Sequence, residues 1–282
     1  MKRIVLLAAI ASLMTSQAFA GPWLKSLAAA QKEAKEQKEL ILVDLFADWC
    51  GWCHQLEQQV FPSETFQKAT RNKVLLRLNT EDGGDGTRLA QQFQVTSLPT
   101  SLLMTHDMVI AGIIKGFYPA DKYAEAIHEV ESKYGEFKKR VADEDAIAGD
   151  YAKRLDLARD LRNHFAYPQA EVRFKKLAAD PKVPAAIRDQ AYFDLALTQY
   201  FQKKYDDSMK TIRQFSTVQA TGEQYERSRV LASEIYVQQG NFLGAVNELK
   251  NFKAKFPKSP MIAQVDMILP QLERRLAAGR AQ

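Results

Sequence analysis

The sequence has very little cysteine. Its 282 residues include only two, Cys50 and Cys53, which stand three positions apart. A structural disulfide framework uses more cysteines at wider spacing, and closing so small a loop restricts the unfolded chain little. A structural zinc site needs four ligands, and no second Cys or His pair stands at matching spacing. The two cysteines are therefore better explained by chemistry than by stability.

Long apolar runs are also missing. The run over residues 4–14 is too short to span a hydrocarbon core of about 30 Å, and no later stretch reaches the roughly 20 apolar residues that a spanning helix needs. This run follows two basic residues and precedes Ala18-Phe19-Ala20, which is the layout of a secretory signal peptide. We expect residues 1–20 to be cleaved after Ala20, which predicts a periplasmic protein without membrane insertion.

No sign of charge dominates the chain. The formal net charge is +5, from 39 basic and 34 acidic residues. So small an excess gives no reason to expect nucleic acid or a membrane surface as a partner. The densest basic run, residues 138–140, lies beside Glu136 and is typical of a solvated helix face. A nucleotide-binding motif is absent as well, and we expect no cofactor.

Helices and strands alternate in the first half of the chain. The apolar patterns predict a helix over 22–39, a strand over 40–46, a helix over 50–68 with a kink near Pro62, a strand over 74–78, a helix over 87–93, strands over 101–104 and 109–114, and a helix from 120 to about 134. A tight turn joins the last two strands as an antiparallel hairpin. The prediction is an α/β domain over residues 21–138, with helices on both faces of a mixed sheet.

The second half of the chain, after a predicted linker at 139–149, contains paired helices without strands. Three segments of residues 150–282 can be aligned, beginning at Tyr167, Tyr205 and Phe242. Each aromatic residue is followed three positions on by a small residue and seven positions on by a large apolar one. A small residue at a fixed place lets two helices approach closely, so repetition of the unit predicts a stacked helical solenoid.

This helical region resembles tetratricopeptide repeats. Its last copy has Tyr236, Gly240, Phe242, Ala245 and Pro257 at the spacing of that family. The copies are further apart than the 34-residue period of the family, so their loops or helices are longer. The resemblance implies a groove that holds a protein partner, and an irregular helical bundle is the alternative.

The two cysteines form a C-x-x-C motif between a predicted buried strand and the start of a helix. Unpaired amide N–H groups and the positive end of the helix dipole favour an anion at that place. The pKa of a cysteine there falls from about 8.5 to between roughly 3.5 and 7.5. We expect Cys50 to attack a substrate and Cys53, one turn into the helix, to resolve the mixed disulfide.

The stretch from about Pro22 to Tyr134 resembles the thioredoxin family, first of all through its Trp49-Cys50-Gly51-x-Cys53 signature. The resemblance implies a redox-active disulfide between the two cysteines. It also implies that Asp44, on the strand before the motif, is the buried acid that exchanges a proton with Cys53. Arg77 falls where thioredoxins place a lysine near this acid.

A second family match is the loop Ser97-Leu98-Pro99-Thr100, followed by a glycine after the last strand. In the family this proline is cis, which turns the backbone of Leu98 outward to pair with a substrate strand. The resemblance therefore implies that Leu98 and Pro99 bind substrate together with Trp49.

The motif departs from the family at two positions. Trp52 replaces the proline or histidine that is common between the cysteines, and His54 replaces a usual lysine. We expect Trp52 either to contact substrate or to serve packing, and Gly51, His54 and Arg77 to tune the thiolate. For His54 and Arg77, a surface position without an electrostatic role stays open.

The function that follows is a periplasmic thiol:disulfide oxidoreductase that acts on protein thiols and disulfides. Asp44 and the absence of a Pro-His pair between the cysteines favour a reductase, which needs electrons from a membrane-bound donor. The helical repeats recruit substrate or a partner. Two alternatives remain, an adaptor or chaperone that binds a partner through its repeats, and a c-type haem protein, because Cys50 to His54 also spells C-x-x-C-H.

Overall fold

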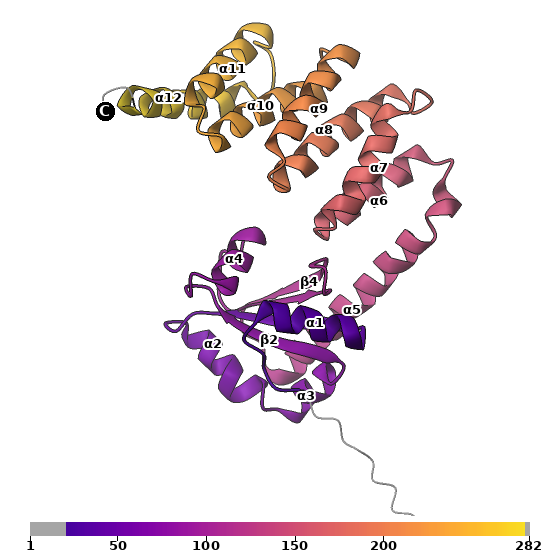
Figure 1. Cartoon of the computed structure of the whole chain (residues 1–282), viewed down its shortest axis with the longest axis vertical. Helices are drawn as coiled ribbons and strands as arrows, with labels where there is room; N and C mark the ends of the chain where they lie inside the picture. Colours follow the sequence, from indigo (N-terminus) through magenta and orange to yellow (C-terminus); the bar gives the residue numbers. More distant parts are fainter. Residues whose placement is uncertain (1–20, 280–282) are drawn as a thin grey trace, which may run out of the picture. The chain divides into compact units, whose positions relative to one another are not determined.

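The computed structural model describes residues 21–279, so the predicted signal peptide at residues 1–20 lies outside the described part. Two compact units make up the chain (Figure 1). Among the described residues, the first unit contains residues 21–107 and Ala111–Glu131, and the second contains Met108–Ile110 and residues 132–279. The first is an α/β unit, and the second is built mainly of helices.

A four-stranded sheet forms the centre of the α/β unit. Its strands are β1 (Leu40–Phe46), β2 (Lys73–Asn79), β3 (Thr100–Met104) and β4 (Ile110–Lys115), in the spatial order β2-β1-β3-β4. Strand β1 pairs parallel with β2 and antiparallel with β3. Only residues 105–109 join β3 to β4, too few for a parallel crossover, so this pair is antiparallel. The predicted mixed sheet is confirmed.

The helices of this unit alternate with the strands. They are α1 (Leu27–Gln37), α2 (Gly51–Gln55), the π-helical turn η1 (Leu56–Val60), α3 (Glu64–Thr70), α4 (Asp85–Gln92) and the first part of α5 (Ala120–Ala142), which continues into the second unit. In β1 the five central residues are buried, as expected for a strand that is covered on both faces. Aromatic rings add to this core, with the centroids of Phe61 and Phe66 4.9 Å apart.

The prediction of one kinked helix over residues 50–68 is wrong. The segment instead contains α2, η1 and, after a break at Pro62, the separate helix α3. Proline has no amide N–H to donate to the preceding turn. The hydroxyl of Ser63 then accepts a hydrogen bond from the amide of Phe66 (3.2 Å), which caps the start of α3.

The first helix begins at Leu27 and not at Pro22. The residues before it run beside the edge strand β2, where the amide of Leu24 donates to the carbonyl of Leu75 (2.8 Å) and the amide of Arg77 donates to the carbonyl of Leu24 (2.9 Å). This pairing satisfies backbone groups that a sheet edge otherwise leaves open. Ser26 then caps α1.

Helix α5 ends at Ala142 and not near Tyr134. Its apolar stripe continues past the predicted end, since Tyr134 and Phe137 are both buried and stand one turn apart. The end of α5 and a 3-10 turn, Glu144–Ile147, therefore occupy much of the stretch predicted as a linker.

The helical unit contains α6 (Tyr151–Asn163), α7 (Tyr167–Ala179), α8 (Ala185–Phe201), α9 (Tyr205–Val218), α10 (Glu223–Gln238), α11 (Phe242–Lys255) and α12 (Ile262–Gly279). Each of these helices packs against the next in the chain, and α8 also packs against α10. The predicted helical region after the α/β domain is confirmed. Within residues 21–279, no helix is both long enough and apolar enough to cross a membrane.

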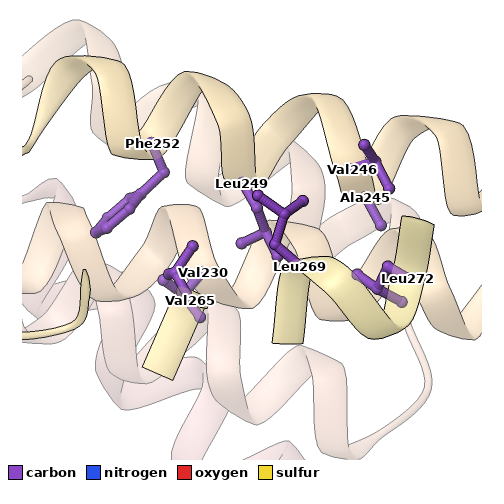
Figure 2. Close-up of a cluster of buried hydrophobic side chains, with 8 residues drawn as sticks. All are labelled: Val230, Ala245, Val246, Leu249, Phe252, Val265, Leu269 and Leu272. Atoms are coloured by element: carbon purple, nitrogen blue, oxygen red, sulfur yellow. The ribbon is translucent and has the colours of Figure 1, made fainter. Parts of the chain in front are cut away.

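The three aligned segments begin helices α7, α9 and α11. Their small residues, Ala170, Ser208 and Ala245, are all fully buried. Figure 2 shows the last of these sites, where side chains of α11 meet those of α10 and α12. Ala245 and Leu249 both lie in this apolar cluster, so the residue pattern marks positions where neighbouring helices come close.

We expect Ala245→Leu to destabilise the protein by about 1–3 kcal/mol, because the larger side chain overpacks a site that is 0% exposed. Urea unfolding followed by circular dichroism measures the change. Ala263→Leu, at an exposed position of α12, is the matched control and leaves stability within about 0.5 kcal/mol. Equal stability of the two variants would contradict a close helix approach at Ala245.

Candidate redox site

Cys50 and Cys53 form a disulfide bond at the start of α2. Cys50 is the N-cap residue of this helix, and its sulfur accepts a hydrogen bond from the amide of Cys53 at 3.2 Å. An amide in this position is a donor of the kind that stabilises a cysteine thiolate. Cys50 is 4% exposed and Cys53 is 0% exposed, so Cys50 is the more accessible of the two sulfur positions.

A small apolar cluster surrounds the disulfide. Ala47 is buried with the two cysteines, and Phe46 and Leu98 pack against them. The Leu98–Pro99 peptide bond is cis, as the resemblance implies, and Pro99 is buried. The carbonyl of Pro99 accepts a hydrogen bond from the amide of Gly116 (2.8 Å), which ties this loop to the end of β4. The fold therefore brings the cysteines, Leu98 and Pro99 together from separate parts of the chain.

Asp44 lies in the middle of β1 and is 0% exposed. In the sheet it stands directly opposite Arg77 of β2 and Ser101 of β3. The Nε atom of Arg77 donates to Oδ2 of Asp44 at 3.1 Å. Burial raises the pKa of Asp44 to about 7, although the charge of Arg77 acts in the opposite direction. A carboxyl group with this pKa can both take up and release a proton near neutral pH.

Arg77 is not the exposed cation that one interpretation of the sequence allowed. Its side chain is 15% exposed, and its guanidinium lies 4.2 Å from the centre of the Phe46 ring. Besides Asp44 it also binds Glu57 on η1, with Nη1 as the donor. This hydrogen bond holds the pKa of Glu57 below its ordinary value. Arg77 thus links the buried acid to a carboxylate at the surface.

Sequence reasoning missed Glu57, Ser101 and Tyr123. Glu57 could have been found from its position four residues after Cys53, which on a helix gives the same face. Ser101 is the residue of β3 opposite Asp44, but only the strand register reveals this. Tyr123 donates its hydroxyl proton to Oγ of Ser101, and both residues are buried. Burial raises the pKa of Tyr123 far above its ordinary value, and the charge of Asp44 adds to this effect.

Two tryptophans, one directly before Cys50 and one between the two cysteines, are open to solvent. Trp49 is 69% exposed and Trp52 is 61% exposed. The indole N–H of Trp49 donates to Glu81 at 2.8 Å, while the Trp52 ring lies 5.3 Å from that of Phe117, in the loop after β4. Large exposed aromatic side chains beside a reactive pair offer contact area for a substrate chain.

His54 and Gly51 have fewer contacts. Nε2 of His54 lies 2.9 Å from the carbonyl oxygen of Asp48, and Nδ1 lies 3.9 Å from a carboxylate oxygen of Glu57. No described hydrogen bond joins His54 to either sulfur atom. A side chain at Gly51 would project into open space. Over residues 21–279, no group of three or more His, Cys, Asp or Glu side chains is placed to hold a metal ion.

Comparison with known families matches residues 27–131 to the thioredoxin-like domain. The chain therefore has a thioredoxin-like α/β domain, followed by a helical region. Among curated proteins it is 38% identical over 73 residues to the thiol:disulfide interchange protein DsbD of Colwellia psychrerythraea, a match that covers 25% of this chain and 12% of that protein. It is 28% identical over 100 residues to DsbD of Haemophilus influenzae, covering 34% and 17%.

Among solved structures, the oxidised C-terminal domain of Neisseria meningitidis DsbD matches 38% of this chain and 98% of its own, with a TM-score of 0.34 and 18% identity. The chain matches less than a fifth of the length of the two curated relatives. These matches cover between 25% and 38% of this chain.

Proposed function

We propose that this protein is a thiol:disulfide oxidoreductase that exchanges dithiol and disulfide with protein substrates. The observation that carries the proposal is the Cys50–Cys53 disulfide at the start of α2, in a domain whose buried Asp44 has a pKa of about 7. The names of the relatives, thiol:disulfide interchange proteins, support the same chemistry. The match of residues 27–131 to a thioredoxin-like domain also favours dithiol exchange over haem attachment at C-x-x-C-H.

Reduction of a substrate takes two exchange steps. In the first, the Cys50 thiolate attacks one sulfur of the substrate disulfide, and the other substrate sulfur leaves as a thiolate. In the second, the Asp44 carboxylate accepts the proton of the Cys53 thiol. The Cys53 thiolate then attacks Sγ of Cys50, the protein disulfide forms, and the second substrate thiolate leaves.

Several residues around the pair have supporting roles in this proposal. Trp49, Trp52, Leu98 and Pro99 bind the substrate chain, since the two tryptophans are exposed and Leu98 packs on the cysteines. Gly51 lies inside the C-x-x-C motif and His54 directly follows it, and both influence the stability of the Cys50 thiolate. Arg77 influences the redox pair indirectly, through its contact with Asp44.

The direction that we propose is reduction in the periplasm, after signal-peptide cleavage behind Ala20. Electrons then come from a membrane-bound donor, because the chain has no third cysteine to regenerate its own pair. A near-neutral buried acid favours the resolving step, which oxidises the protein while it reduces the substrate.

The helical unit, from about residue 150 onward, recruits the substrate or a partner protein in this proposal. We assign it to a tetratricopeptide-like repeat architecture because three helices begin with the same aromatic and small-residue pattern, at Tyr167, Tyr205 and Phe242. Tethering a binding unit to the redox pair raises the effective concentration of substrate at Cys50.

Equilibration of the mature protein with glutathione buffers tests the function, with thiol trapping to follow the cysteine pair and an absorbance spectrum of the same sample. We expect a reduction potential near or below that of thioredoxin, about −270 mV. A potential far above this value would make the protein an oxidase or isomerase. A Soret band, or a pair that does not cycle, would overturn the oxidoreductase assignment.

A further inference from the structure

The buried acid has one oxygen that the described contacts leave unused. Oδ2 of Asp44 accepts from Nε of Arg77, but Oδ1 is buried and has no hydrogen-bond partner. An ionised carboxylate without a donor on one oxygen is costly in a site that excludes water. A donor for this oxygen can come from a residue that stands opposite Asp44 on a neighbouring strand.

Ser101 meets this requirement. It is the register partner of Asp44 on β3, and directly opposite residues of an antiparallel pair project to the same face of the sheet. Ser101 is 1% exposed. Its oxygen already accepts the proton of the Tyr123 hydroxyl, so the proton of Ser101 itself is free to go to another acceptor.

We propose that Ser101 and Tyr123 are positioning residues for Asp44, with Tyr123 orienting the Ser101 hydroxyl so that it donates to Oδ1 of the ionised carboxylate. This deepens the proposed function, on which it rests, because it concerns the acid of the resolving step. Tyr123 contributes orientation only, since its own proton stays on its oxygen while it donates to Ser101.

Few other charged or polar groups around Asp44 are candidates for a contact with its carboxylate. Arg77 faces it from β2, and Glu57 on η1 acts on it through its charge. Nη2 of Arg77 also lacks a partner, so a two-pronged pairing of Arg77 with Asp44 is the competing arrangement. That arrangement does not involve Ser101 or Tyr123. Removal of the hydroxyl groups of these two residues therefore distinguishes it from the proposed arrangement.

The test is the titration of the Asp44 carboxyl carbon by NMR in the oxidised, full-length mature protein. We expect Ser101→Ala to raise its pKa by about one unit, because the ionised form loses a donor. Tyr123→Phe keeps the ring and raises the pKa by a smaller amount. Tyr225→Phe, another buried tyrosine but in the helical unit, leaves it unchanged. An unaltered Asp44 titration in both site variants, with any loss confined to thermal stability, would overturn the proposal.

A kinetic measurement extends the test to the reduced protein. Stopped-flow reaction with dithiobis-nitrobenzoate releases one nitrothiobenzoate when Cys50 attacks and a second when Cys53 resolves the mixed disulfide. A shift of the Asp44 pKa from 7 to 8 lowers the ionised fraction of Asp44 at pH 7 about fivefold. We expect the rate of the second phase to fall by the same factor. If the wild-type protein shows no second phase, the proposed function fails while the NMR titration still decides the role of Ser101.

Discussion

Cys50→Ser lowers the rate of insulin reduction with dithiothreitol as electron source to the uncatalysed background, a loss of at least about a thousandfold. The reason is that the Cys50 sulfur is the nucleophile of the first exchange step, and a serine hydroxyl at this position cannot form a mixed disulfide. The turbidity of precipitating insulin chains measures the rate.

Cys53→Ser is the matched variant, because it removes the other sulfur of the same disulfide. It retains the first step and therefore accumulates a mixed disulfide with substrate, visible as a higher-mass species on a non-reducing gel. Cys50→Ser gives no such species. If Cys50→Ser kept both the biological activity of the protein and the binding of its partner, the adaptor hypothesis would replace the assignment as an oxidoreductase.

Asp44→Asn slows the second exchange step about 100-fold at pH 7, since the variant has no carboxylate to accept the Cys53 proton. The first step, in which Cys50 attacks, changes much less. Stopped-flow release of nitrothiobenzoate resolves the two phases in one experiment. Equal slowing of both phases would show that Asp44 acts on Cys50 and not on the resolving cysteine.

The same substitution changes how stability depends on pH. The pKa of Asp44 is about 7 in the folded chain, against 3.8 for an ordinary aspartate. The folded state holds the proton more tightly, so its stability is full below about pH 4 and is lost as the pH rises through 7. This difference between the folded and unfolded pKa of Asp44 corresponds to a loss of about 4 kcal/mol in the free energy of unfolding.

Urea unfolding of the oxidised protein at a series of pH values measures this dependence. We expect Asp44→Asn to be more stable than wild type above about pH 7, because it no longer buries an ionised carboxylate. The matched control is Asp156→Asn, whose side chain is 71% exposed in the wild-type protein. Parallel stability curves for wild type and Asp44→Asn would contradict the raised pKa.

Much of the α/β unit follows from local patterns. The apolar run of residues 40–46 predicted β1 with its observed bounds, because a strand buried on both faces has a simple signature. The helix after the motif was harder to predict. Its π-helical turn and the capped restart at Ser63 depend on how the segment packs, and composition does not reveal that. Likewise, α5 continues past its predicted end because Phe137 is buried.

The sequence by itself predicted dithiol exchange, since two cysteines three positions apart behind a buried strand are typical of this chemistry, and the resemblance to the thioredoxin family implied Asp44 as the acid. The resemblance also placed Arg77 near this acid, but only the tertiary structure placed Ser101 there. Arg77, Asp44 and Ser101 come from three separate strands, and only the register of the sheet places them in one row. The apolar pattern of one strand does not show which residue of a distant strand stands opposite it, because that register is fixed only when the buried faces of the strands pack together.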